Sequence, residues 1–315
     1  MYRFLFLLAL SLVLIAPAAS QAPADWQQQV QYEMDITLKA DRHRMFGTQR
    51  ITYTNNSPDT LRTVYYHLYF NAFNPNSMMA ERNRHLPDPD GRIVPRIFNL
   101  GPDEVGFHRV ESLTQDGSDV SFTITDTVLR VDLAAPIPPG GSTTFAMTFN
   151  SQVPLQTRRS GRDNREGIDY SMSQWYPKLA EYDERGWHAD PYVGREFYAP
   201  YGTFDVEITL PAHYTVGATG MLQNPDDVGH GYDLEGTGTY RPGDGNNAPS
   251  DSLTWHFRAE NVHDFAWAAD PDYIHERVDV GDGTVYHLLY EPDVEDRWQP
   301  MDQWVPQLIQ FFSDE

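Results

Sequence analysis

The chain has 315 residues, a formal net charge of −22 and a sequence pI of about 4.7. A surface this acidic repels phosphate backbones, so the composition argues against binding to nucleic acid. The absence of cysteine excludes disulfides, thiolate catalysis and cysteine-ligated zinc. The length suits one large or two smaller domains, and the 22 Gly, 23 Pro and 18 Tyr favour strands and turns over helices.

The first twenty residues have the pattern of a signal peptide. Arg3 gives a positive start, residues 4–16 are apolar apart from Ser11, and small residues follow at 18–20. The apolar run is too short for a permanent membrane anchor. We therefore expect residues 1–20 to be removed, and the mature chain to be exported to the periplasm or secreted without a membrane anchor.

After this segment, apolar and polar residues alternate with a period of two in six stretches. The apolar positions are Tyr32, Met34, Ile36 and Leu38; Val120, Phe122 and Ile124; Leu129, Val131 and Leu133; Phe145, Met147 and Phe149; Phe204, Val206, Ile208 and Leu210; and Leu253, Trp255 and Phe257. Each stretch predicts a strand with one buried and one solvated face, which is typical of antiparallel sheets. Glycine, proline and asparagine turn signals separate the stretches. We expect residues 21–291 to form a mostly β domain.

Two segments interrupt this rhythm, and the pattern changes near the C-terminus. Residues 74–105 form a long Pro/Asn/Asp-rich connection with a turn at 87–91, and residues 241–252 form a polar hairpin tip. The spacing of the last apolar residues predicts a helix from about Val294 to Phe312 that Pro306 kinks or shortens. Its apolar stripe needs a partner surface, so we expect the chain to be a piece of a longer protein.

The common catalytic motifs are not found. The only His-Glu pair, His275 and Glu276, has Asp279 where the second histidine of a helical zinc motif would stand. There is no Gly-x-Ser-x-Gly elbow and no phosphate-binding glycine loop. We therefore predict no catalytic and no metal-binding residues in this chain, although a metal site assembled from distant positions stays open.

Residues 173–190 carry large aromatic side chains within a charged loop. Pro177 cannot donate to a sheet, so a strand is predicted to end near Tyr176. Aromatic groups in such a loop pack against a second domain or a ligand, or they pin a surface loop on its own core through Trp175 and Trp187. Both interpretations remain open from the composition.

Four segments in order resemble the zinc aminopeptidases of the aminopeptidase N family. They are residues 173–177, 204–211, 214–220 and 262–268. The resemblance runs from about Val30 to the end of the chain and is closest to an exported bacterial subgroup with a Gln-Trp-Tyr-Pro loop. It implies a saddle-like, mostly antiparallel β-sandwich domain, followed by a helical catalytic domain that carries the zinc ligands. Residues 292–315 would be the first helix of that missing domain.

The resemblance also implies a function. The full-length parent would bind zinc, although this segment holds no cofactor, and would remove N-terminal residues from peptide substrates. The family's substrate-contacting Gln matches Gln174, and Tyr176 stands where the family usually has a Glu or Gln that contacts the substrate amine. Gln174 and Tyr176 are therefore the expected substrate-binding residues, the missing catalytic domain is the expected partner, and the segment alone is expected to be inactive. The alternative is a secreted, non-catalytic β-sandwich that binds protein or glycan.

Overall fold

The computed structural model describes residues 26–86, 96–194, 198–244, 251–281, 283–298 and 300–313. The predicted signal peptide, the turn at 87–91 and residues 245–250 of the polar hairpin tip lie outside these ranges. The described chain is mostly β, with several antiparallel sheets and a helix at its C-terminal end, which confirms the predicted fold class.

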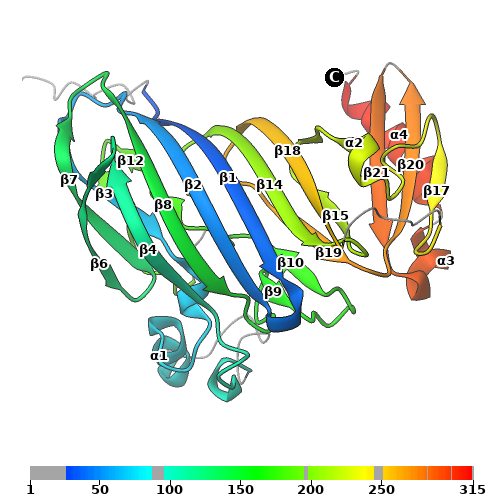
Figure 1. Ribbon diagram of the computed structural model, residues 1–315, viewed down its shortest axis with the longest axis horizontal. Helices are drawn as coiled ribbons and strands as arrows, with labels where there is room; N and C mark the ends of the chain where they lie inside the picture. The colour runs from blue at the N-terminus through cyan, green and yellow to red at the C-terminus, as the bar shows by residue number, and fades with distance from the viewer. Residues whose placement is uncertain are drawn as a thin grey trace, which may run out of the picture.

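The largest layer is an eight-stranded sheet with the order β16-β18-β14-β1-β2-β8-β4-β5 (Figure 1). Its strands are β1 (Gln29–Lys39), β2 (Arg44–Thr54), β4 (Phe107–Gln115), β5 (Ser118–Asp119), β8 (Ser142–Gln152), β14 (Gly202–Pro211), β16 (Met221–Leu222) and β18 (Ser252–Val262). Every second residue of β1 from Val30 to Leu38 is buried, and β8, β14 and β18 show the same alternation at the predicted positions. A short 3-10 helix, η1 (Ala40–Arg42), joins β1 to β2.

One central pair in this sheet differs from the antiparallel prediction, because β1 and β14 run parallel. Alternation reports that one face is buried, and it carries no information about strand direction. The two strands approach closely where Val30 lies opposite Gly202. A Cβ atom on Gly202 would lie 2.1 Å from the carbonyl oxygen of Val30, so this pairing requires glycine.

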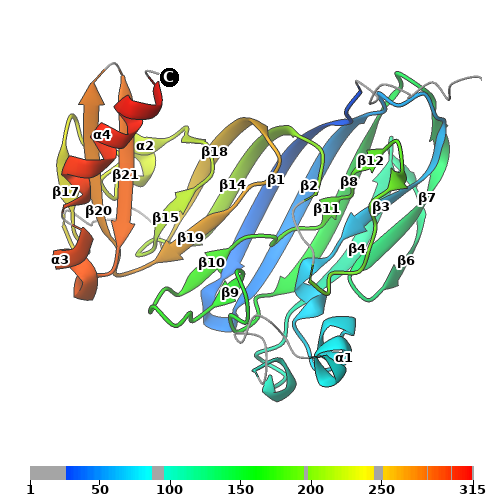
Figure 2. The ribbon, with the colours of Figure 1, turned by 180° about the vertical axis from the view of Figure 1, so that it is seen from behind.

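Two four-stranded sheets face the large sheet, and the core lies between these layers (Figure 2). One has the order β11-β3-β7-β6 and consists of β3 (Leu61–His67), β6 (Ser121–Thr125), β7 (Val128–Ile137) and β11 (Lys178–Leu179). The other has the order β15-β19-β10-β9 and consists of β9 (Gly161–Arg162), β10 (Tyr170–Met172), β15 (Thr215–Ala218) and β19 (Trp267–Asp270). Tyr66 of β3 meets Phe145 of β8 edge to face, with ring centroids 6.3 Å apart, so side chains from both layers share one core.

The predicted burial of the 120–124 stretch is only partly correct. Phe122 is half-buried, but Ile124 is 40% exposed. The reason is that β6 is the edge strand of its sheet, so few neighbours cover its end.

The connection 74–105 is more ordered than a structureless loop. After a 3-10 helix, η2 (Tyr69–Ala72), it contains α1 (Met78–His85) and a 3-10 helix, η3 (Arg96–Asn99). The Ser77 hydroxyl accepts a hydrogen bond from the Ala80 N–H at 3.0 Å and caps the start of α1.

The C-terminal part forms a separate three-stranded sheet, β17-β20-β21. The elements are β17 (Gly238–Tyr240), β20 (Ile274–Gly281) and β21 (Thr284–Tyr290), with α2 (Pro225–Val228), η4 (Pro292–Val294), α3 (Glu295–Trp298) and α4 (Met301–Ser313). The single predicted helix is thus two helices, and Pro306 lies inside α4 without ending it. α4 lies across β20 and β21 (Figure 2), and the Tyr286 hydroxyl donates to the Met301 carbonyl oxygen at 3.1 Å.

The apolar stripe of α4 is largely uncovered. Trp304, Leu308 and Phe312 are 58%, 53% and 73% exposed, while Val305 and Ile309 are half-buried. None of the helices in the described ranges combines the length and apolarity needed to cross a membrane.

Candidate functional site

Gln174 lies at a sharp change of backbone direction. β10 ends at Met172, earlier than the predicted strand end near Tyr176, because Gln174 adopts a left-handed conformation with φ 55°. Its side chain is buried, with 1% of the residue exposed, and its Nε2 has no hydrogen-bond partner among the described residues. A buried amide donor without a partner is unusual in a native fold and needs a physical reason.

Tyr176, the second predicted binding residue, is a core residue that holds a buried ion pair. It is fully buried, and its hydroxyl donates to Asp264 Oδ1 at 3.0 Å. Lys178 Nζ lies 3.1 Å from Asp264 Oδ2, and the Phe265 N–H donates to Oδ1 at 2.9 Å. Burial lowers the pKa of Lys178, and the Asp264 carboxylate opposes this shift.

The Lys178–Asp264 pair was not anticipated from the sequence. Its two members are far apart in the chain, and each lies inside one of the segments that carry the family resemblance or directly after it. The only available signal was a lysine in an apolar strand directly after Pro177.

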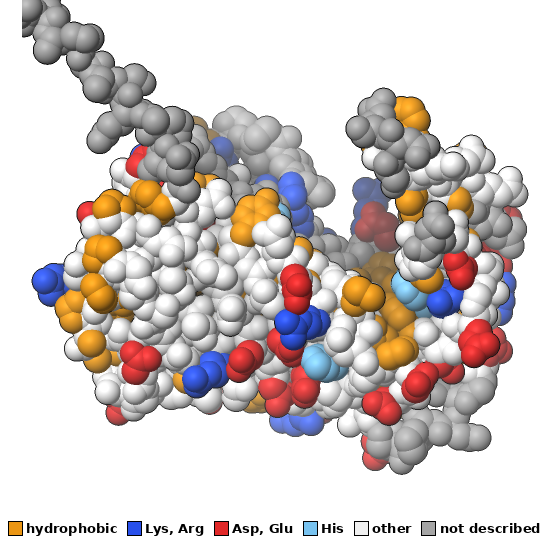
Figure 3. All heavy atoms as spheres, turned by 90° about the horizontal axis from the view of Figure 1, so that it is seen from above, with side chains coloured by type: hydrophobic (Ala, Val, Ile, Leu, Met, Phe, Trp, Pro, Cys, Tyr) orange, Lys and Arg blue, Asp and Glu red, His pale blue; other side chains and the backbone are white. Residues whose placement is uncertain are grey.

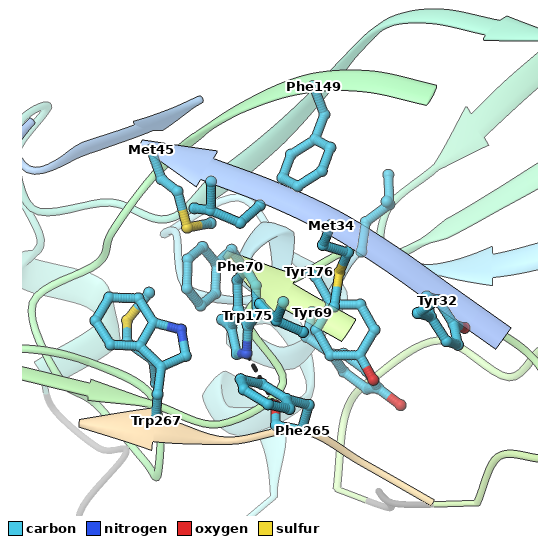
Figure 4. Close-up of a cluster of buried hydrophobic side chains, with 14 of the residues drawn as sticks. Tyr32, Met34, Met45, Tyr69, Phe70, Phe149, Trp175, Tyr176, Phe265 and Trp267 are labelled. Carbon is cyan, nitrogen blue, oxygen red and sulfur yellow. Dashed lines mark hydrogen bonds between the residues drawn. The ribbon is translucent and has the colours of Figure 1, made fainter. Parts of the chain in front are cut away.

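Trp175 connects the loop that carries Gln174 to β19 and to Phe265, which precedes β19. Its Nε1 donates to the Phe265 carbonyl oxygen at 2.9 Å, and its ring meets those of Phe265 and Trp267 edge to face (Figure 4). Trp187 is half-buried and stacks on Tyr53. Both tryptophans thus pack on the chain's own core. This agrees with the interpretation that Trp175 and Trp187 pin the loop on that core.

The four resembling segments come together in space. β10, which directly precedes the first segment, pairs with β19, with Met172 opposite Trp267. β15 pairs with the other side of β19, with Ala218 opposite Trp267. Phe204 of β14 stacks on Tyr32 at 4.7 Å and meets Tyr176 edge to face at 6.0 Å. The segments therefore build one continuous structure around the Gln174 loop.

A hollow of about 1070 Å³ lies between the β15-β19-β10-β9 sheet and the C-terminal sheet. Ser173, the neighbour of Gln174, lines it together with Trp267, Arg277 and His287. Figure 3 looks into the hollow between these two parts, where hydrophobic side chains and a histidine are visible. Gly217 of β15 allows β21 to approach, because a Cβ atom there would lie 2.4 Å from Leu289 Cδ1.

A chain of histidines supports the far wall of this hollow. His275 Nδ1 lies 2.7 Å from the His230 carbonyl oxygen and therefore donates to it, which leaves Nε2 as an acceptor. His287 Nδ1 lies 2.8 Å from His275 Nε2 and must supply the proton between them. Burial lowers the pKa of His275 to about 4, so this arrangement is neutral near pH 7.

The described residues include one group of three carboxylates that could hold a metal ion: Asp270, Asp272 and Glu291, with ligand atoms within 4.8 Å of one another. Three oxygen donors without a histidine suit a hard cation and not zinc. Asp270 already accepts the N–H groups of Asp169 and Asp272, and burial raises the pKa of Glu291 to about 7.

No protein-family profile and no curated protein matches the chain. Among solved structures, it is similar to the M1 zinc metallopeptidase of Deinococcus radiodurans. A mutant bound to a Tyr-Ser-Ala substrate is 16% identical with a TM-score of 0.44, and the match covers 83% of this chain and 46% of that one. A second structure of this enzyme is 15% identical with a TM-score of 0.42, and the match covers 84% and 47%.

Both of these structures are described as M1 zinc metallopeptidases. The aligned part spans about half the length of these enzymes.

Proposed function

We propose that the chain is the N-terminal β part of an exported zinc metallo-aminopeptidase-like protein, and that Gln174 forms part of its substrate pocket. The observation that carries this proposal is the buried Gln174 amide, whose Nε2 lacks a partner among the described residues and whose neighbour Ser173 lines a large hollow. A glutamine amide can donate and accept, which suits the polar end of a bound peptide. A polar group of the bound substrate would then be the hydrogen-bond partner that Gln174 Nε2 lacks among the described residues.

In this proposal, the zinc ligands and the general base lie beyond Glu315, and a bound zinc ion would supply Lewis-acid chemistry for peptide hydrolysis. Tyr176 acts indirectly in this proposal, because the hydrogen bond from its hydroxyl to Asp264 holds the loop that carries Gln174. The coding sequence beyond Glu315 discriminates this function from a secreted binding protein. A His-Glu-x-x-His motif followed by a downstream Glu supports the enzyme, and its absence supports the β-sandwich that binds protein or glycan.

Replacing Gln174 with alanine in the full-length protein is expected to weaken substrate binding by about 1–3 kcal/mol, because a polar group of the peptide would lose its partner. The effect should appear mainly as a higher KM for a short peptide, with kcat little changed. The melting temperature should change little, because Gln174 Nε2 has no hydrogen-bond partner among the described residues to lose.

The exposed Gln223 gives a matched control, and its alanine variant should leave KM unchanged. If Gln174→Ala lowers the melting temperature by several degrees and leaves kcat/KM unchanged, Gln174 only fixes the loop and the site assignment is wrong.

Export is a separate part of the proposal. We expect the mature protein to begin near residue 21, because a positive start, an apolar run and small residues precede this point. N-terminal sequencing of the protein recovered from the periplasm or medium measures this directly. A protein that retains Met1, or that stays in the cytoplasm, would rule out export by this segment.

A further inference from the structure

A second hollow, of about 1030 Å³, lies on a different part of the molecule from Gln174. It is bordered by the hairpin of β12 (Tyr182–Asp183) and β13 (Gly186–Trp187) and by residues 198–201. Carboxylates line it at Glu181, Asp183, Glu184 and Asp190, and Arg185 is the only lysine or arginine among its described lining residues. The hollow is therefore acidic, with tyrosine rings in its wall at Tyr69, Tyr192 and Tyr198.

Glu181 is the unusual member of this wall. Only 7% of it is exposed, and its carboxylate accepts a hydrogen bond from the Tyr182 N–H. Across the described ranges, no basic side chain forms an ion pair with it. Burial raises the pKa of the Glu181 carboxyl to about 7, which is the expected result for an acid that lacks a counter-charge.

Asp183 differs from Glu181 because both of its carboxylate oxygens already have partners. Tyr198 donates its hydroxyl to Oδ2 at 3.0 Å, and the Arg185 N–H donates to Oδ1 at 2.8 Å. His188 Nε2 also lies 2.8 Å from Oδ2. Accordingly, these hydrogen bonds keep the pKa of Asp183 below its usual value, although burial opposes them. Asp183 therefore needs no further partner.

His67 adds a second acceptor to this wall. Its Nε2 lies 3.1 Å from the His188 carbonyl oxygen and must donate to it, so Nδ1 of the neutral ring is an acceptor. This Nδ1 is buried and has no hydrogen-bond partner among the described residues, and only 7% of His67 is exposed. The His188 N–H in turn donates to the Glu181 backbone carbonyl oxygen at 2.9 Å, so the backbone of His188 links Glu181 to His67.

A metal ion does not fit this arrangement well. The carboxylates of the hollow are not among the described groups whose ligand atoms converge, and the volume far exceeds that of a single ion. An ammonium group fits better, because it brings three donors and a positive charge, and aromatic faces attract cations.

We propose that this hollow binds a primary ammonium group, such as that of a lysine side chain in a peptide, with Glu181 as its counter-charge. The site is independent of the proposed function, because neither Gln174 nor any residue that lines the first hollow also lines this one.

Calorimetric titration of the protein at pH 8 with acetyl-lysine methylamide tests the proposal, and acetyl-norleucine methylamide is the uncharged control of nearly equal shape. We expect the lysine probe to bind at least tenfold more tightly than the norleucine probe. Glu181→Gln should abolish this preference, while Glu184→Gln, at the exposed rim, should change the affinity less than twofold. Calcium at millimolar concentration should not compete with the lysine probe.

Glu181→Gln should also fold, since it removes a buried charge, and its melting temperature at pH 8 should equal or exceed that of the unmodified protein. Equal binding of the two probes, an unchanged preference in Glu181→Gln, no binding at all, or displacement by calcium would each overturn the proposal.

Discussion

Replacing Asp264 with asparagine is expected to lower the free energy of unfolding by about 3–5 kcal/mol, because it leaves a buried charge without its partner. The Lys178 side chain is 2% exposed, and Asp264 Oδ2 lies 3.1 Å from its Nζ. Asparagine keeps an oxygen at Oδ1, so the bonds from the Tyr176 hydroxyl and the Phe265 N–H can persist. Urea unfolding at pH 7 measures the loss.

The loss of stability in Asp264→Asn should come from the unpaired charge of Lys178 and not from a change in packing. The double variant Asp264→Asn with Lys178→Met removes both charges and should recover most of the loss. As a matched control, Asp205→Asn breaks a more exposed cluster in which Asp205 is 37% exposed, and it should cost less than about 1 kcal/mol. A double variant as unstable as the single one would show that the cost comes from packing.

The sequence predicted the strands well where one face is buried along a whole element. In β1 and β14 the alternation of apolar and polar residues matches burial residue by residue, because a pleated strand between core and solvent imposes this pattern. The parallel pairing of these two strands could not be predicted, since burial of one face is the same in either direction. The exposure of Ile124 escaped prediction for a related reason, because alternation does not tell an edge strand from a central one.

The sequence could not predict the local arrangement around the two candidate site residues. The motifs led to Gln174 and Tyr176, yet β10 ends at Met172, because a left-handed conformation at a glutamine has no signature in the sequence. The burial of Tyr176 could not be predicted from the local sequence, because its hydrogen-bond partner, Asp264, is 88 residues away in the chain. Such long-range pairing depends on the register of β10 against β19, which is set by the whole fold and not by local pattern.

Below pH 6.5, the buried His108 is expected to weaken the fold by about 1.4 kcal/mol per pH unit relative to a His108→Gln variant. Only 3% of His108 is exposed, its ring stacks on Phe70 at 4.7 Å, and its Nδ1 lies 2.6 Å from Ser151 Oγ. Burial lowers the pKa of His108 to about 3, so the folded protein keeps it neutral while the unfolded chain gains a proton as the pH falls below about 6.5. Its contribution to stability is thus fully present above pH 6.5 and is lost progressively between pH 6.5 and about 3.

The variant separates this titration from the others. Glutamine can still hydrogen-bond Ser151 but does not titrate, so the difference in unfolding free energy between the two proteins should fall by about 2–3 kcal/mol between pH 7.5 and 4.5. Glu181 and Glu291, whose pKa values are raised to about 7, favour the folded state as the pH falls, but they do so equally in both proteins and cancel in the difference. A difference that stays constant with pH would mean that His108 protonates as readily in the folded protein as in the unfolded chain, which its burial without a charged partner forbids.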